Sequence, residues 1–153
     1  MNPHMSAKQI LLVEDNPDDA ELTLLAFKQC RIANEVVLAR DGVEALEMIF
    51  GKTGDRPQAA MRYPSLILLD LKLPRVNGLQ VLARLRSDPA TRRIPVVMLT
   101  SSVEQEDVLK SYDLGANSYV RKPVDFEHFT EAVHQLGFYW LLLNESPPVG
   151  VTA

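Results

Sequence analysis

The sequence predicts an α/β domain in which a five-stranded parallel sheet is covered by helices on both faces. Short apolar runs alternate five times with stretches of helical periodicity. Such alternation calls for right-handed crossovers and a parallel, doubly wound sheet. The run Leu66 to Leu69 is apolar throughout, which suits a strand buried on both faces. A chain of 153 residues has room for one such domain.

Each element is placed by its own pattern. Strands are expected at residues 10–13, 36–39, 66–69, 95–99 and 118–120, and a loop at 52–64. Helices are expected at 17–31, from 41–42, from 79, at 103–114 and at 125–143. Asn16 and Pro17 fit the N-cap and first turn of the first helix. Gly115 fits the position just after the fourth helix.

Composition narrows the class of protein. The chain is 46% apolar and 24% charged with a net charge of −4, so it shows no electrostatic footprint for nucleic acid. Its single cysteine, Cys30, excludes an internal disulfide and fits a reducing, cytoplasmic location. We interpret Cys30 as a small, at least half-buried apolar residue. The longest apolar run, residues 138–143, is too short to span a membrane.

The two ends are expected to lie outside the fold. Residues 1–4 precede a second methionine, Met5, and are interpreted as an addition to the natural start. No secretory signal is recognisable. Residues 6–143 are expected to form the domain, and residues 144–153, with two prolines and a glycine, a loose tail.

Chemically active side chains follow four of the predicted strands. Glu14 and Asp15 follow the first strand, Asp70 the third, Thr100 the fourth and Lys122 the fifth. In an open parallel sheet the carboxyl ends of the strands lie at one edge, where ligands bind. We therefore expect these five residues to share one pocket.

Three carboxylates in one pocket repel each other and need a counter-charge. Mg²⁺, a hard cation with oxygen ligands, supplies it, and Lys122 adds a compact positive charge. Such a site suits attack by Asp70 on a phosphoryl group, giving an aspartyl-phosphate. The cation, Lys122 and the Thr100 hydroxyl would then face the phosphoryl oxygens.

Each residue taken alone has a simpler explanation. Asp15 or Asn16 could only cap a helix. Thr100 suits a strand end for its branched side chain, and an isolated lysine such as Lys122 usually lies on the surface. The coincidence of suitable residues at four strand ends favours the shared site.

These residues stand in motifs that resemble the receiver domain of two-component response regulators. The matching segments are residues 13–16, 69–74, 77–78, 99–101 and 122–123, within a resemblance that covers roughly residues 10–136. The family implies a flavodoxin-like sheet of strand order 2-1-3-4-5. It also implies a sensor histidine kinase as partner and Mg²⁺ as cofactor.

The resemblance assigns the metal and phosphoryl roles residue by residue. Asp70 would be the phosphoacceptor, taking its phosphoryl group from a phosphohistidine. Asp15 would bind the metal directly, Glu14 through water, and Asp70 and the backbone carbonyl of Lys72 would complete the protein ligands. The last of the five strand-end residues, Lys122, would sense the phosphoryl group together with a threonine.

Thr100 would be the threonine that senses the phosphoryl group with Lys122. Tyr119 would change rotamer when Thr100 moves. The Lys122–Pro123 bond is expected to be cis, again on the resemblance alone. Lys72 and Ser102 would flank the route of the attacking water. Because neither offers a carboxylate or amide to position that water, we expect slow self-dephosphorylation.

The end of the chain is expected to carry the output. On the last helix Phe126, Phe129, Val133 and Leu136 have the spacing of a face turned to the sheet. Residues 138–143 are apolar all round, so some of them must be covered by another surface. We expect a homodimer through Phe138, Tyr139, Trp140 and Leu142; the alternative is that this segment folds back over its own domain.

The predicted function is that of a single-domain response regulator, similar to those paired with bacterial phytochromes. It is phosphorylated on Asp70, signals through protein contacts, uses neither nucleic acid nor membrane, and turns over no metabolite as an enzyme would. One alternative is a phosphorelay intermediary that passes its phosphate onward. Another is a Mg-dependent phosphatase with an Asp nucleophile, but that class needs an acid where Lys72 stands. A flavin module is disfavoured by the acidic loop 14–19.

Overall fold

A single parallel sheet forms the centre of the molecule. The computed structural model describes residues 8–29, 34–56, 59 and 61–147. Its strands are β1 (Lys8–Val13), β2 (Asn34–Ala39), β3 (Leu66–Leu69), β4 (Val96–Thr100) and β5 (Ser118–Arg121). Their order is β2-β1-β3-β4-β5 and every neighbouring pair is parallel. The predicted order and fold class are confirmed, with strand ends within two residues of expectation.

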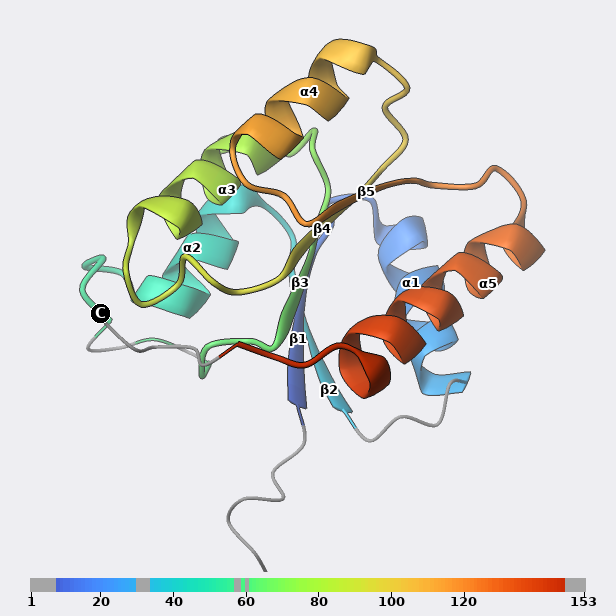
Figure 1. Cartoon of the computed structure of the whole chain (residues 1–153), viewed down its shortest axis with the longest axis horizontal. Helices are drawn as coiled ribbons and strands as arrows, with labels where there is room; N and C mark the ends of the chain where they lie inside the picture. The colour runs from blue at the N-terminus through green and yellow to red at the C-terminus, as the bar shows by residue number, and fades with distance from the viewer. Residues whose placement is uncertain (1–7, 30–33, 57–58, 60, 148–153) are drawn as a thin grey trace, which may run out of the picture.

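Helices cover both faces of this sheet. They are α1 (Pro17–Gln29), α2 (Gly42–Phe50), α3 (Gly78–Ser87), α4 (Gln105–Asp113) and α5 (Phe126–Gly137). Figure 1 shows α1 and α5 on one face and α2, α3 and α4 on the other. Because the strands are all parallel, each of these crossovers returns the chain to the same end of the sheet.

Alternating side chains of the strands fill two cores. Ile10 and Leu12 of β1 pack toward α1 and α5. Leu11 and Val13 pack toward α2 and α3. Strand β3 repeats the pattern and is buried at every position, as its continuous apolar run predicted. Burial on both faces fixes the strand register, because a shift of one residue would exchange the two cores.

Short polar side chains cap the starts of α1 and α3, and a glycine follows the end of α4. Asn16 Oδ1 accepts the Asp18 and Asp19 backbone N–H groups at 2.9 and 3.1 Å. Asn77 forms a capping box with Gln80 at the start of α3. Gly115 follows α4 with φ +101°, the left-handed conformation expected of a glycine there.

The last helix changes its winding partway along. α5 ends at Gly137, and the next six residues form a π-helical segment, η2 (Phe138–Leu143). Within η2 the structure buries Leu141, whereas Phe138 and Leu142 are more than half exposed. The predicted end of the last helix near residue 143 agrees with the structure, but its last six residues wind as a π-helix. The assignment of Phe126 to the sheet-facing side was wrong, because this residue is 49% exposed.

Some expectations fall outside the described residues. These concern Cys30, the end of the first helix at Arg31, residues 1–4 and tail residues 148–153. In the part of the chain that the structure describes, every helix is too short or too polar to cross a bilayer.

Candidate functional site

Three backbone hydrogen bonds place the key residues at the carboxyl edge of the sheet. The Glu14 N–H donates to the Ala39 carbonyl at 3.0 Å, and the Asp70 N–H donates to the Val13 carbonyl at 3.0 Å. The Lys122 N–H donates to the Thr100 carbonyl at 2.8 Å. Each of these three residues thus lies one position beyond its own strand and is anchored to the end of a neighbouring strand.

Lys122 is the cation at the centre of this edge. Its side chain is only 7% exposed, and its ammonium forms ion pairs with three carboxylates. It donates to Glu14 Oε1, to Asp19 Oδ2 at 3.0 Å and to Asp70 Oδ2 at 3.1 Å. The structure therefore brings together residues that lie up to 108 positions apart in the chain.

The carboxylates of Glu14, Asp15 and Asp70 form a compact group beside this lysine. Each offers an oxygen, and these three oxygens all lie within 4.8 Å of one another. Glu14 and Asp70 are buried, while Asp15 is open to solvent. This set of hard oxygen donors with one open side fits Mg²⁺, which binds through a few carboxylates and retains waters.

Burial and charge shift the protonation of two of these groups. Burial raises the pKa of Glu14 to about 7; the negative charge of Asp70 adds to this, and the hydrogen bond from Lys122 opposes it. Burial alone would lower the pKa of Lys122, but the Glu14 hydrogen bond and the charges of Asp70 and Glu14 raise it above its ordinary value. Lys122 is therefore a permanent cation, and the acidic group has a surplus of negative charge that a divalent cation would balance.

The backbone around Asp70 depends on a close approach by Gly78. A Cβ on Gly78 would lie 2.2 Å from the Asp70 carbonyl oxygen, and the Gly78 N–H donates to the Leu71 carbonyl at 2.8 Å. The Leu71 N–H in turn donates to Asp70 Oδ1 at 2.7 Å. One carboxylate oxygen of Asp70 thus faces the backbone, and the other faces Lys122.

Thr100, Ser102 and Tyr119 connect the site to α4. Thr100 is buried and its hydroxyl oxygen accepts the Ser102 N–H at 3.3 Å. The Tyr119 hydroxyl donates to the Ser102 carbonyl at 3.2 Å. The Ser102 hydroxyl donates to Asp107 Oδ2, in the first turn of α4, at 2.5 Å. The loop after β4 therefore contacts both the buried hydroxyl and the start of α4.

One expectation drawn from the resemblance is contradicted. Among the described residues no peptide bond is cis, so the Lys122–Pro123 bond is trans. The trans form is the more stable state of most X–Pro bonds by about 0.5–1 kcal/mol. Lys122 reaches all three carboxylates with this bond in trans.

Sequence reasoning missed Asp19 as a member of the site. This residue occupies the first turn of α1, where an acidic side chain is expected simply to favour the helix dipole. Lys72, in contrast, lies where expected in the loop after β3, with an exposed side chain.

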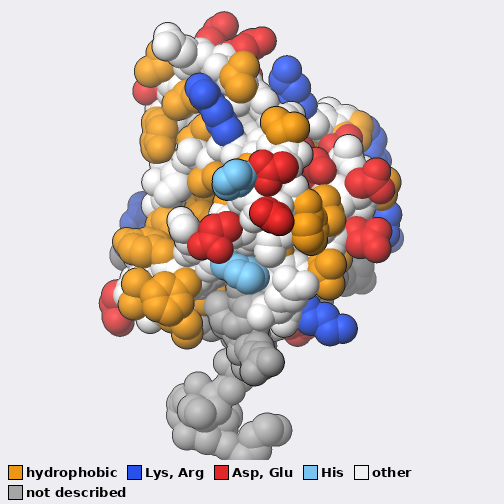
Figure 2. Space-filling model, turned by 90° about the vertical axis from the view of Figure 1, so that its right-hand side faces the viewer, with side chains coloured by type: hydrophobic (Ala, Val, Ile, Leu, Met, Phe, Trp, Pro, Cys, Tyr) orange, Lys and Arg blue, Asp and Glu red, His pale blue; other side chains and the backbone are white. Residues whose placement is uncertain are grey.

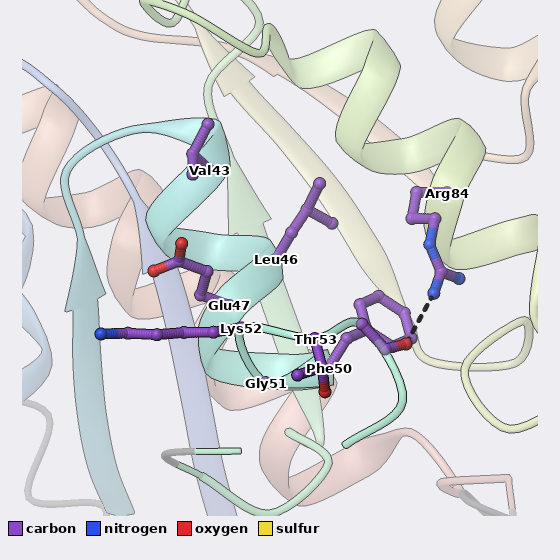
Figure 3. Close-up of a pocket in the computed structure, with 9 residues that line it drawn as sticks. Val43, Leu46, Glu47, Phe50, Gly51, Lys52, Thr53 and Arg84 are labelled. Carbon is purple, nitrogen blue, oxygen red and sulfur yellow. Dashed lines mark hydrogen bonds between the residues drawn. The ribbon is translucent and has the colours of Figure 1, made fainter. Parts of the chain in front are cut away.

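A separate cavity of about 300 Å³ lies away from this edge (Figure 3). It is lined by one side of α2 from Val43 to Phe50, by residues 51–54 and by Arg84 of α3. The Arg84 guanidinium stacks over the Phe50 ring at 3.8 Å and donates to the Gly54 carbonyl at 3.4 Å. Because an arginine bridges its wall and no residue of the acidic group lines it, we attribute this cavity to packing.

A doubly wound sheet of this order, with an acidic group and a lysine at its carboxyl edge, defines a phosphoryl-accepting signalling domain. The chain belongs to the response regulator receiver domain family, whose model matches residues 10–134. It is accordingly a response regulator of two-component signalling. Among individual proteins it is 38% identical over 136 residues to response regulator Rcp1 of Synechocystis sp., covering 88% of this chain and 89% of that protein.

Solved structures agree with this assignment. The phosphorylated cyanobacterial phytochrome response regulator RcpA matches with a TM-score of 0.85 and 39% identity, covering 94% of this chain and 100% of that chain. The bacteriophytochrome response regulator RtBRR is 53% identical with a TM-score of 0.70, covering 93% of this chain and 85% of that chain. Rcp1 itself has been solved in a Mn²⁺-bound form. The family and the geometry of the acidic group agree on a divalent cation as cofactor.

Proposed function

We propose that this chain is a phosphorylation switch whose phosphoacceptor is Asp70. The observation that carries the proposal is the position of Asp70 Oδ2, 3.1 Å from the buried ammonium of Lys122 and beside the carboxylates of Glu14 and Asp15. A phosphoryl group on Asp70 would lie next to a permanent cation in a largely dehydrated site, where such charge stabilisation is strongest. Asp15, Glu14 and the Lys72 carbonyl are proposed to hold Mg²⁺.

The phosphodonor is proposed to be a phosphohistidine on a sensor kinase. A carboxylate oxygen of Asp70 attacks phosphorus, and the phosphorus–nitrogen bond breaks. The electron pair of that bond stays on the imidazole nitrogen, which regains a proton, and Asp70 becomes an acyl phosphate. Bound Mg²⁺ supplies positive charge for the phosphoryl oxygens. The similarity to RcpA and RtBRR supports a kinase of the phytochrome type.

Thr100 and Tyr119 are proposed to transmit the modification. The Thr100 hydroxyl would turn from the Ser102 N–H toward a phosphoryl oxygen, and Tyr119 would follow because both now contact Ser102. Slow self-dephosphorylation remains our expectation. Lys72 carries no group to activate water, and the Ser102 hydroxyl is engaged by Asp107. A half-life of only seconds for the phosphorylated form would contradict this.

The proposed assembly is a cytoplasmic homodimer of the receiver domain, residues 6–143, formed through η2. Phe138, Tyr139 and Leu142 are about half exposed, as an interface would require. Trp140 is half-buried, packs against its own core and meets the Tyr139 ring edge-on at 5.0 Å. Trp140 and Leu141 pack against their own domain, and the exposed side chains of the segment support the proposed interface.

The central proposal is tested with acetyl phosphate and Mg²⁺. Intact mass should show one added phosphate on the wild type and none on Asp70→Asn. Asp113→Asn, which removes an exposed carboxylate at the end of α4, serves as the control and should be labelled like the wild type. Equal labelling of Asp70→Asn would disprove the assignment.

A further inference from the structure

Asp19 contacts the central lysine from an unexpected element. In a capping box the acidic side chain of the third helical residue reaches back to the N-cap N–H. Here the N-cap Asn16 N–H donates instead to Glu14 Oε2 at 3.2 Å. Asp19, the third residue of α1, directs its carboxylate to Lys122 at 3.0 Å. The helix start is thus capped by Asn16, and Asp19 is left free to bind the lysine.

The three contacts of Lys122 use its whole donor capacity. An ammonium group has three N–H donors and no acceptor. In this structure they are directed to Glu14, Asp19 and Asp70. Phosphorylation of Asp70 would free the N–H that this carboxylate now accepts. A phosphoryl oxygen can accept a further hydrogen bond from Lys122 only if Glu14 or Asp19 gives up its N–H.

Solvent exposure shows which carboxylate can leave at the lowest cost. The side chains of Glu14 and Asp70 are 2% and 11% exposed, whereas that of Asp19 is 31% exposed. A buried carboxylate that loses its partner remains dehydrated and unpaired, which is costly. Asp19 lies at the rim, so water can replace the lysine.

We propose that Asp19 is a positioning residue that holds one donor of Lys122 in the unphosphorylated domain and yields it to the phosphoryl group. This inference rests on the proposed function of Asp70 as phosphoacceptor. Asp19 competes with the incoming anion for the same N–H, and its charge repels that anion. Removing the Asp19 carboxylate should therefore favour phosphoryl binding.

The chain provides a matched control in Asp18. It precedes Asp19 in the same first turn, carries the same charge and has its N–H bonded to the same Asn16 oxygen. Asp18 is exposed, and among the ion pairs of the described residues none involves it. Asp18→Asn thus removes the long-range charge and the helix-dipole contribution without removing a contact to Lys122.

The test compares Asp19→Asn and Asp18→Asn at saturating Mg²⁺. Two quantities are measured: the affinity for beryllofluoride, a phosphoryl mimic, by calorimetry, and the rate of labelling by acetyl phosphate. In labelling, the bond between phosphorus and the acyl oxygen breaks and acetate leaves as the Asp70–phosphorus bond forms. Asp19→Asn should increase both quantities roughly three- to tenfold, the range expected for loss of one partly exposed competing ion pair, and Asp18→Asn less than about twofold.

The Mg²⁺ affinity provides a readout of opposite sign. Loss of either carboxylate should weaken Mg²⁺ binding slightly through the reduced negative field, whereas only Asp19→Asn should strengthen beryllofluoride binding. Asp19→Ala and Asp18→Ala repeat the comparison with a side chain that has no oxygen to accept the Lys122 hydrogen bond.

Two results would overturn the inference. In one, Asp19→Asn matches Asp18→Asn in beryllofluoride affinity. In the other, it binds the anion more weakly than the wild type, which would mean that Asp19 assists Lys122 and does not compete for it. Failure of the underlying function looks different, because then the wild type is not labelled or Asp70→Asn is labelled equally.

Discussion

At the scale of single residues, the site is held in an electrostatically unfavourable state when no cation is bound. Glu14 is buried beside Asp70, and burial raises its pKa to about 7. Below pH 7 the folded protein therefore retains a proton that the unfolded chain releases near its ordinary pKa of 4.5. The folded state loses stability as the pH rises from this ordinary value through 7.

Glu14→Gln should accordingly stabilise the metal-free domain at pH 8 by about 1–3 kcal/mol, since the glutamine oxygen can still accept the Lys122 hydrogen bond. The gain should disappear as the pH falls toward 4.5. Urea unfolding in the presence of a chelator, at a series of pH values, measures it. A less stable variant at pH 8 would contradict the expectation.

Asp41→Asn is a control of opposite sign. The pKa of Asp41 is lowered by the Glu44 backbone hydrogen bond and by Arg75, so its charge stabilises the fold above its pKa. The substitution should be neutral or slightly destabilising at pH 8, because asparagine is also a good N-cap.

Added Mg²⁺ should stabilise the wild type by mass action, and it should stabilise the Glu14→Gln variant much less.

The sequence predicted the members of the site that directly follow strands. Glu14, Asp70 and Lys122 are positioned by strand ends, and strand ends are visible in an apolar pattern. Asp19 was missed because the direction of a side chain in the first turn of a helix depends on tertiary packing. The cis form of the Lys122–Pro123 bond was inferred from resemblance alone, and nothing local in the sequence supports it.

At the scale of elements, α4 is the helix with the weakest attachment. Ser111 is its only buried residue, and its N-cap Glu104 makes no side-chain capping bond. The Ser102–Asp107 hydrogen bond at 2.5 Å instead ties its first turn to the loop after β4. A helix with few buried contacts opens locally at low free energy. This property suits an element that is proposed to shift when Thr100 moves.

Asp107→Ala should loosen α4 specifically. Loss of this bond, worth about 1 kcal/mol, should speed amide hydrogen exchange in residues 105–113 about fivefold. Glu106→Ala is the matched control. It removes the neighbouring acid, which forms only an exposed ion pair with Lys110 on the same helix. Mass spectrometry measures the exchange rates of residues 105–113 in both variants. Equal acceleration in the two would assign the effect to the helix dipole and not to the Ser102–Asp107 hydrogen bond.

The strand ends were predicted within two residues, whereas the change from α-helix to π-helix at residue 138 was not predicted. The strands are short apolar runs between polar residues, so their ends are visible. Residues 138–143 are all apolar, and a uniform run contains no signal that separates α-helical from π-helical winding. The Asn144 N–H donates to the Tyr139 carbonyl at 2.6 Å, five residues back, which is the spacing of a π-helix.

At the scale of the whole molecule, polar and apolar surfaces lie side by side on the face of α1 and α5. Figure 2 shows acidic and histidine side chains in the middle of this face, with hydrophobic side chains on both sides. The exposed apolar residues of η2 continue the surface of α5. This distribution supports the proposed homodimer, since apolar patches bounded by charge are typical of interfaces.

Leu142→Ser should convert a dimer into a monomer in light scattering, because it removes an exposed apolar contact and leaves the core intact. Leu109→Ser is the control: Leu109 is similarly exposed, at 64% against 58% for Leu142, but lies on α4. It should leave the mass unchanged. A wild type of monomer mass, or a Leu142→Ser protein of dimer mass, would exclude this interface.

The wide separation of the ion-paired residues has a consequence for synthesis on the ribosome. Glu14, Asp19 and Asp70 emerge long before Lys122, which pairs with a carboxylate 108 residues upstream. A nascent chain whose first strands have collapsed would carry an uncompensated acidic rim until β5 is added. Docking of the fifth strand therefore neutralises charge as well as completing the sheet. Until then, free Mg²⁺ in the cell would reduce the repulsion among these carboxylates.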